Sequence, residues 1–131
     1  MNHRSLCDAS EMQTEESVQR DVLASLLEAW SSENALAVLD LISDGYIGHM
    51  LHLEAGERTK ATYPSQISSF RAKNPGTIFT VIEQRRLVDG FLTRLMASRA
   101  DGAYSYGMNQ SRFVGPLIAE EWAIWSVWHS V

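Results

Sequence analysis

The sequence predicts a single α+β domain in which three N-terminal helices pack into a strongly curved antiparallel sheet, so that the whole is cone-shaped. Three observations predict this class. Apolar residues recur at helical spacing before residue 74, long strand-like runs fill residues 77–128, and Gly-containing turns separate those runs. Long antiparallel strands in a meander must twist and curl, which leaves a hollow that helices can fill.

Each element has its own local signal. Apolar residues step by four from Val18 to Trp30, and Thr14 is placed to cap the helix that they form. Asp44-Gly45 and Asp89-Gly90 are turn signals. The expected helices cover 15–30, 34–43 and 63–73, a short strand covers 46–53 before a polar loop over 54–60, and long strands cover 77–88, 91–100, 104–114 and 117–128.

Composition bounds the class of protein. The chain of 131 residues is 45% hydrophobic and 21% charged, which is typical of one globular domain over 15–131 behind a flexible tail over 1–14. No apolar run approaches the ~18–20 residues of a membrane span, and the N-terminus lacks a secretory signal, so we expect a cytoplasmic protein without membrane contact. The single cysteine, Cys7, excludes an internal disulfide and a Cys-based zinc site.

Charge excludes another class. The net charge is −5, and the 11 basic residues are dispersed along the chain. A nucleic-acid-binding protein usually carries a basic patch and a positive balance, so no nucleic-acid partner is expected. The sequence also has no phosphate-binding glycine loop and no metal-ligand cluster, which predicts neither a cofactor nor a metal.

A family resemblance rests mainly on residues 107–125, GMNQSRFVGPLIAEEWAIW, where an Arg-bearing strand, a Gly turn and an Ile-x-Glu-x-Trp strand follow one another. Asp44-Gly45-Tyr46 with His49, and Phe70-Arg71 with Pro75, add to it. Over residues 15–128 the chain resembles SnoaL-like polyketide cyclases and ketosteroid isomerase-like proteins of the nuclear transport factor 2-like superfamily. The resemblance implies their cone-shaped fold and a cavity for an apolar small molecule.

The resemblance is incomplete at the positions that carry chemistry. SnoaL-like cyclases place an acidic general acid/base three residues before the strand Arg, and Asn109 stands there, three before Arg112. An amide does not transfer protons near neutral pH, so Asn109 is expected to orient or polarise a carbonyl. Ser126 occupies a position where the family often has Asp, and residues 100–104 lack the family's loop His.

The remaining ionisable groups give the candidate catalytic set His49, Asn109 and Glu83. Histidine is the residue type that ordinarily exchanges a proton near neutral pH, and the resemblance places His49 at a family pocket-wall position, which makes it the expected proton-transfer group. Glu83 shares a strand face with Arg85, as a pocket acid or as a surface ion pair. The candidate substrate-binding residues are Tyr46, Arg94, Arg112, Trp122 and Ser126, although either Arg is equally suited to bridging strands.

Two functions follow. The first is a cofactor-free enzyme for proton-transfer chemistry, namely cyclisation, isomerisation or hydration/dehydration, on a polyketide-, terpenoid- or steroid-like molecule. The alternative is a non-catalytic binding or dimerisation module on the same fold. Tryptophans lie on both faces of the last strand, at Trp122 and Trp125, and cannot share one core. A homodimer through the outer sheet face is therefore expected.

Overall fold

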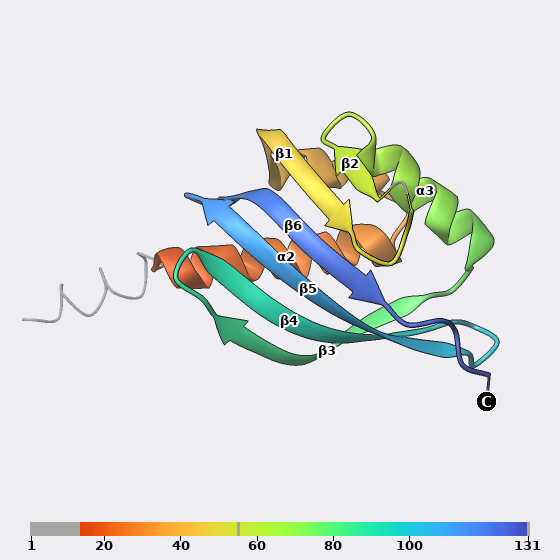
Figure 1. Ribbon diagram of the computed structural model, residues 1–131. Coiled ribbons are helices and arrows are strands. Elements are labelled where there is room, and N and C mark those ends of the chain that lie inside the picture. Colours follow the sequence, from red (N-terminus) through yellow and green to blue (C-terminus); the bar gives the residue numbers. More distant parts are fainter. Residues whose placement is uncertain (1–13, 55, 131) are drawn as a thin grey trace, which may run out of the picture.

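The computed structural model describes residues 14–54 and 56–130. Within these residues the elements, in chain order, are α2 (Glu15–Ser31), the 3-10 helix η1 (Ala35–Asp40), β1 (Ile42–Met50), β2 (Glu57–Thr59), α3 (Tyr63–Lys73), β3 (Ile78–Arg86), β4 (Gly90–Ser98), β5 (Tyr104–Val114) and β6 (Leu117–Trp125). The strands form one sheet in the order β2-β1-β6-β5-β4-β3 (Figure 1). The predicted α+β class is confirmed.

Helix α2 begins where its cap predicts. The Thr14 hydroxyl oxygen accepts a hydrogen bond from the backbone N–H of Ser17 at 3.0 Å, and Glu15 and Glu16 occupy the first turn. These acidic side chains interact favourably with the positive end of the helix dipole. The apolar stripe of α2 buries Leu23 and Leu26 against the sheet and the other helices.

The second predicted helix is shorter than expected. Only Ala35–Asp40 is helical, as a 3-10 turn, and Ile42 already belongs to β1, where it lies opposite Ile118 of β6. The β1–β6 pair is parallel, whereas every other strand pair is antiparallel. No turn signal specifies this pairing, because the two strands are separated by most of the chain.

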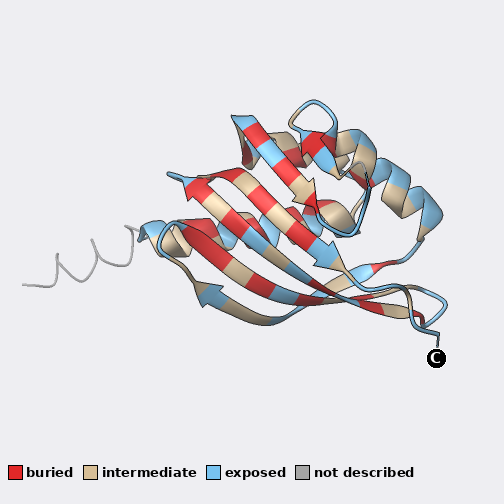
Figure 2. Cartoon of the chain, in the orientation of Figure 1, coloured by how far each residue is buried: buried red, intermediate tan, exposed pale blue. Residues whose placement is uncertain are grey.

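The helices cover one face of the sheet and leave the other open (Figure 1). Side chains therefore alternate along the strands between the covered face and the open face, as the burial pattern shows (Figure 2). The buried core cluster comprises Leu23, Leu26, Ala29, Val38, Ile42, Tyr46, Tyr63, Ile67, Phe91, Phe113 and Ile118. The core thus joins both α-helices and η1 to the concave side of the sheet.

No helix in the described ranges has the length and hydropathy to cross a membrane. The tail expected over 1–14, apart from Thr14, and Cys7 within it lie outside the described residues. The division into tail and domain therefore stays a prediction.

Candidate active site

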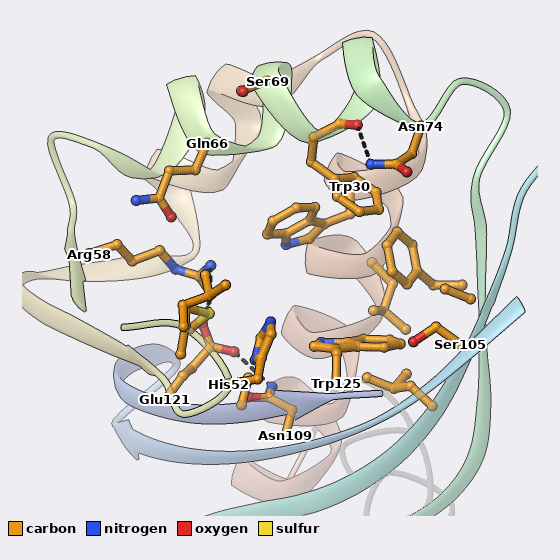
Figure 3. Close-up of a pocket in the computed structure, with 18 of the residues that line it drawn as sticks. Trp30, His52, Arg58, Gln66, Ser69, Asn74, Ser105, Asn109, Glu121 and Trp125 are labelled. Atoms are coloured by element: carbon orange, nitrogen blue, oxygen red, sulfur yellow. Dashed lines mark hydrogen bonds and ion pairs between the residues drawn. The ribbon is translucent and has the colours of Figure 1, made fainter. Parts of the chain in front are cut away.

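A cavity of about 470 Å³ lies between the helices and the covered face of the sheet (Figure 3). One wall is aromatic: the Trp30 ring meets Phe70 and Phe79 edge-on, with ring centroids 5.5 and 6.1 Å away, and Phe79 meets Trp125 at 5.7 Å. Leucines and alanines from α2, β4 and β6 complete the apolar lining. This volume and composition are typical of small-molecule sites.

Glu121 of β6 brings a carboxylate to this apolar space, with only 1% of the residue exposed to solvent. Its Oε1 accepts hydrogen bonds from the Tyr46 hydroxyl at 2.7 Å and the Tyr63 hydroxyl at 3.3 Å. Its Oε2 accepts one from Asn109 Nδ2 at 2.8 Å. A buried carboxylate needs such donors, and here they come from β1, α3 and β5.

Arg58 of β2 balances the charge of Glu121. Its Nη2 lies 3.5 Å from Glu121 Oε1 and donates to the Tyr63 hydroxyl at 3.0 Å, while its Nε donates to the Tyr46 hydroxyl at 3.0 Å. The guanidinium carbon also lies 3.9 Å from the Tyr63 ring centroid. Arg58 and Glu121 therefore form a buried, charge-neutral pair that shares two phenols.

The two phenols are held in their protonated form. Burial raises the pKa of Tyr46 and of Tyr63 well above the ordinary value for tyrosine, and the Glu121 carboxylate raises both further. Burial works against the charge of Arg58, but the facing oxygens of Tyr63, Tyr46 and Glu121 outweigh it, and the pKa of Arg58 is raised. The phenols therefore remain donors to Glu121 at neutral pH.

Asn109 lines the cavity, on the side of β5 that the family resemblance implies. Because Nδ2 donates to the Glu121 carboxylate, the direction of the amide is determined, and its Oδ1 points elsewhere. That oxygen is buried without a hydrogen-bond partner in the described residues. A buried acceptor of this kind costs about 1–3 kcal/mol.

His49, the expected proton-transfer group, lies outside the cavity. Its Nε2 is 2.7 Å from Glu120 Oε2 and its Nδ1 is 3.4 Å from Glu57 Oε2, and its ring stacks on Trp122. The reason is alternation along β1: Tyr46, Gly48 and Met50 are buried, so His49 projects from the open face. The hydrogen bond to His49 lowers the pKa of Glu120, and Arg112 adds to this effect.

Most of the other predicted site residues also lie away from the cavity. Glu83 pairs with Arg85 at 2.8 Å and with Arg94 at 3.2 Å, and these hydrogen bonds lower the pKa of Glu83. Arg112 contacts Glu120 at 3.3 Å. None of these residues, nor Trp122, lines the cavity, whereas Ser126 does, with its hydroxyl 3.1 Å from that of Ser105. Tyr46 is fully buried behind Glu121.

The residues that the sequence reasoning missed are Glu121, Arg58, Tyr63 and Trp30. No local signal identified Glu121. Ser111, which shares the face of Asn109 on β5, lies opposite Glu121 only because the register shifts between Arg112 and Phe113. Arg58 gave no pattern of its own, because β2 has only three residues and its orientation depends on pairing with β1.

The geometry is suited to acid–base chemistry on an apolar molecule. Glu121 is the only acidic side chain among the described lining residues, and Arg58, Tyr63 and Asn109 line the cavity beside it. In the described part of the chain, no three His, Cys, Asp or Glu side chains are grouped as a metal site requires.

No family model matches the sequence, and no curated protein does either. Solved structures do match. IdmH of Streptomyces antibioticus, a candidate polyketide cyclase, is 21% identical over 82% of this chain and 91% of its own, with a TM-score of 0.72. A candidate polyketide cyclase from Acidithiobacillus ferrooxidans is 18% identical over 88% and 92%, with a TM-score of 0.73.

A third match has a ketosteroid isomerase-like fold and was solved with trimethylamine. It comes from Catenulispora acidiphila and is 15% identical over 81% of this chain and 85% of its own, with a TM-score of 0.70. At these identities the matches establish architecture. The chain has the fold of these proteins, which a further match from Mesorhizobium loti shares as an NTF2-like protein and the third match as a ketosteroid isomerase-like protein.

Proposed function

We propose that the protein binds an apolar, ring-containing small molecule in the cavity and catalyses cofactor-free proton transfer on it, with Glu121 as the general base. The observation that supports this most is a buried carboxylate facing a mostly apolar cavity with one aromatic wall. The substrate class is a polyketide-, terpenoid- or steroid-like compound, and the reaction is cyclisation, isomerisation or hydration/dehydration.

The two oxygens of Glu121 have different surroundings. Among the described residues, Oε1 accepts from both phenols and faces Arg58, whereas Oε2 accepts only from Asn109. Oε2 is therefore the oxygen with free capacity to accept a proton from a substrate carbon. Low dielectric surroundings strengthen this interaction, because water does not compete for the carboxylate.

Arg58 supplies the complementary group. Within the described part of the chain, its Nη1 has only the Met50 sulfur as a partner, at 3.4 Å, and a thioether is a weak acceptor. This N–H is the donor available to an oxyanion that develops when the substrate loses a proton next to a carbonyl. The phenols and Asn109 then serve to hold Glu121 in position.

The test uses 2-tetralone, an aromatic ketone with exchangeable protons next to its carbonyl. Proton–deuterium exchange in D₂O, followed by NMR, reports transfer to and from the base without knowledge of the natural substrate. Glu121→Gln should slow the catalysed exchange by roughly 10²–10⁴-fold, the usual contribution of a general base. Glu120→Gln is the matched control, since the neighbouring carboxylate projects from the opposite face, and it should leave the rate within about twofold.

Equal exchange in wild type and Glu121→Gln would contradict the proposal. Loss of exchange in His49→Ala, with Glu121→Gln still active, would instead support the assignment derived from sequence.

A non-catalytic binding module is the second candidate. It is favoured by the Arg58–Glu121 pair, which leaves the carboxylate neutralised in the resting protein. Saturable binding of 2-tetralone without any accelerated exchange would support this reading over the enzyme.

A further inference from the structure

The mouth of the cavity carries hydrogen-bond donors without partners among the described residues, whereas the inner end holds the hydrogen-bonded Arg58–Glu121 pair. Helix α3 places Gln66, Ser69 and Lys73 along the cavity at spacings of three and four residues, which is one face of a helix. In the described residues none of these three side chains has a hydrogen bond or ion pair with the protein. His52, on the loop after β1, lines the same cavity, and its side chain has no hydrogen bond or ion pair with any described residue either.

Figure 3 shows Gln66 on α3 and His52 on the opposite side extending into the same space. Charge is unevenly distributed around it. Arg58 and Glu121 neutralise one another at the inner end, so Lys73 is the one charged lining side chain, in the described set, without a counterion. The chain as a whole has a net charge of −5, so this cationic mouth is opposite in sign to the molecule around it.

We infer that the natural ligand is an amphiphile: an apolar ring system with a carboxylate at the cavity mouth, where Lys73 is its counterion and Gln66, Ser69 and His52 donate hydrogen bonds. The inference rests on the proposed binding function and adds the class of ligand, an aromatic or polycyclic carboxylic acid. A lysine in the last turn of α3 also interacts favourably with the negative end of the helix dipole. Binding measurements distinguish Lys73 as a counterion of the ligand from Lys73 as a partner of the helix dipole. Only the first role makes an anionic ligand bind more tightly than a neutral one.

The experiment compares 2-naphthoate with 2-naphthamide, a neutral probe of nearly the same shape, by isothermal titration calorimetry at low salt. The carboxylate should bind about three- to tenfold more tightly, the range for a solvent-accessible ion pair supported by hydrogen bonds. Raising the salt concentration should reduce that ratio. Lys73→Gln should bring it close to one.

Lys60→Gln is the matched control, because Lys60 is the only other lysine, pairs with Asp44 and does not line the cavity. It should keep the preference of the wild type. Equal affinities for the two probes in wild type, or a preference that survives Lys73→Gln, overturn the inference while leaving apolar binding intact. Failure of both probes to bind overturns the proposed binding function and this inference with it.

Discussion

Among single residues, Tyr46 and Tyr63 are the groups whose ionisation folding alters most clearly. Burial raises the pKa of each phenol, and the neighbouring Glu121 carboxylate reinforces the shift. Below about pH 10 the phenols are protonated in both the folded and the unfolded chain, so they contribute no pH dependence. Above it the unfolded chain releases their protons while the folded chain retains them.

The free energy of unfolding should therefore fall as the pH rises above about 10, by up to about 1.4 kcal/mol per pH unit for each tyrosine. Urea denaturation at pH 9, 10 and 11 measures this slope. Tyr46→Phe should reduce the pH dependence of the unfolding free energy by the contribution of one phenol. The variant should also be less stable than the wild type at every pH. An unchanged slope in Tyr46→Phe would mean that Tyr46 ionises alike in both states.

Asn109 lines the cavity, on the side of its strand that the family resemblance implied, and its chemical role stays a prediction. Local sequence signals do not show which of Glu120 and Glu121 faces the cavity. Those neighbours project from opposite faces, and no local property of either carboxylate distinguishes them. Their orientation is decided by how β6 pairs with β5.

At the scale of elements, that pairing contains an irregularity. Phe113 lies opposite Ile118, but the next pair is Arg112 with Glu120, so Ala119 is an extra residue in β6. As a result Ile118 and Ala119 are both buried, and Glu121 reaches the cavity. With uniform pairing Glu120 would take that place, since a shift of one residue exchanges the two faces.

Helices α2 and α3 and the two tight hairpins were predictable because caps, prolines and Asp-Gly or Gly-Pro turns act locally. The short helix and the first strand were less predictable, since their limits depend on the distant partner Ile118. The position of Arg58 was equally hard to predict, because it depends on the pairing of β2 with β1. Non-local pairing, and not local preference, assembles the candidate site.

The pairing of β1 with β2 depends on a missing side chain. Gly48 lies opposite Arg58, and a Cβ at Gly48 would lie 2.5 Å from the Tyr46 hydroxyl oxygen and 2.9 Å from Arg58 Nε. Both neighbours are buried and hydrogen-bonded to one another, so a shift of either disturbs that network. Gly48 thus allows the Arg58 network to close against the strand.

Gly48→Ala should lower the free energy of unfolding by about 1–3 kcal/mol, the usual cost of overpacking. Gly45→Ala is the control in the same strand, where a Cβ meets nothing within 4 Å, and it should be neutral or slightly stabilising. Chemical denaturation of both variants measures the difference. Equal stability of the two would show that the network yields to the added methyl group.

For the whole molecule, the main open feature is the uncovered face of the sheet (Figure 2). It carries exposed apolar side chains at the centre, with Ile47 41%, Met108 41% and Ile124 48% accessible, and the half-buried Trp122 beside them. Met108 and Ile124 lie directly opposite one another on β5 and β6. Ion pairs of Glu83 with Arg94 and of Glu120 with Arg112 lie on the same face of the sheet.

We propose that this face is the interface of a homodimer, because an apolar centre with charged groups beside it is typical of such surfaces. Sedimentation at tens of micromolar should give twice the chain mass of 14.7 kDa. Ile124→Lys should yield the monomer, since two-fold symmetry introduces the charge twice into one interface. Val88→Lys, in the exposed β3–β4 turn, should remain a dimer. A wild-type mass of one chain would exclude the dimer, and dissociation by Val88→Lys alone would move the interface to that end of the molecule.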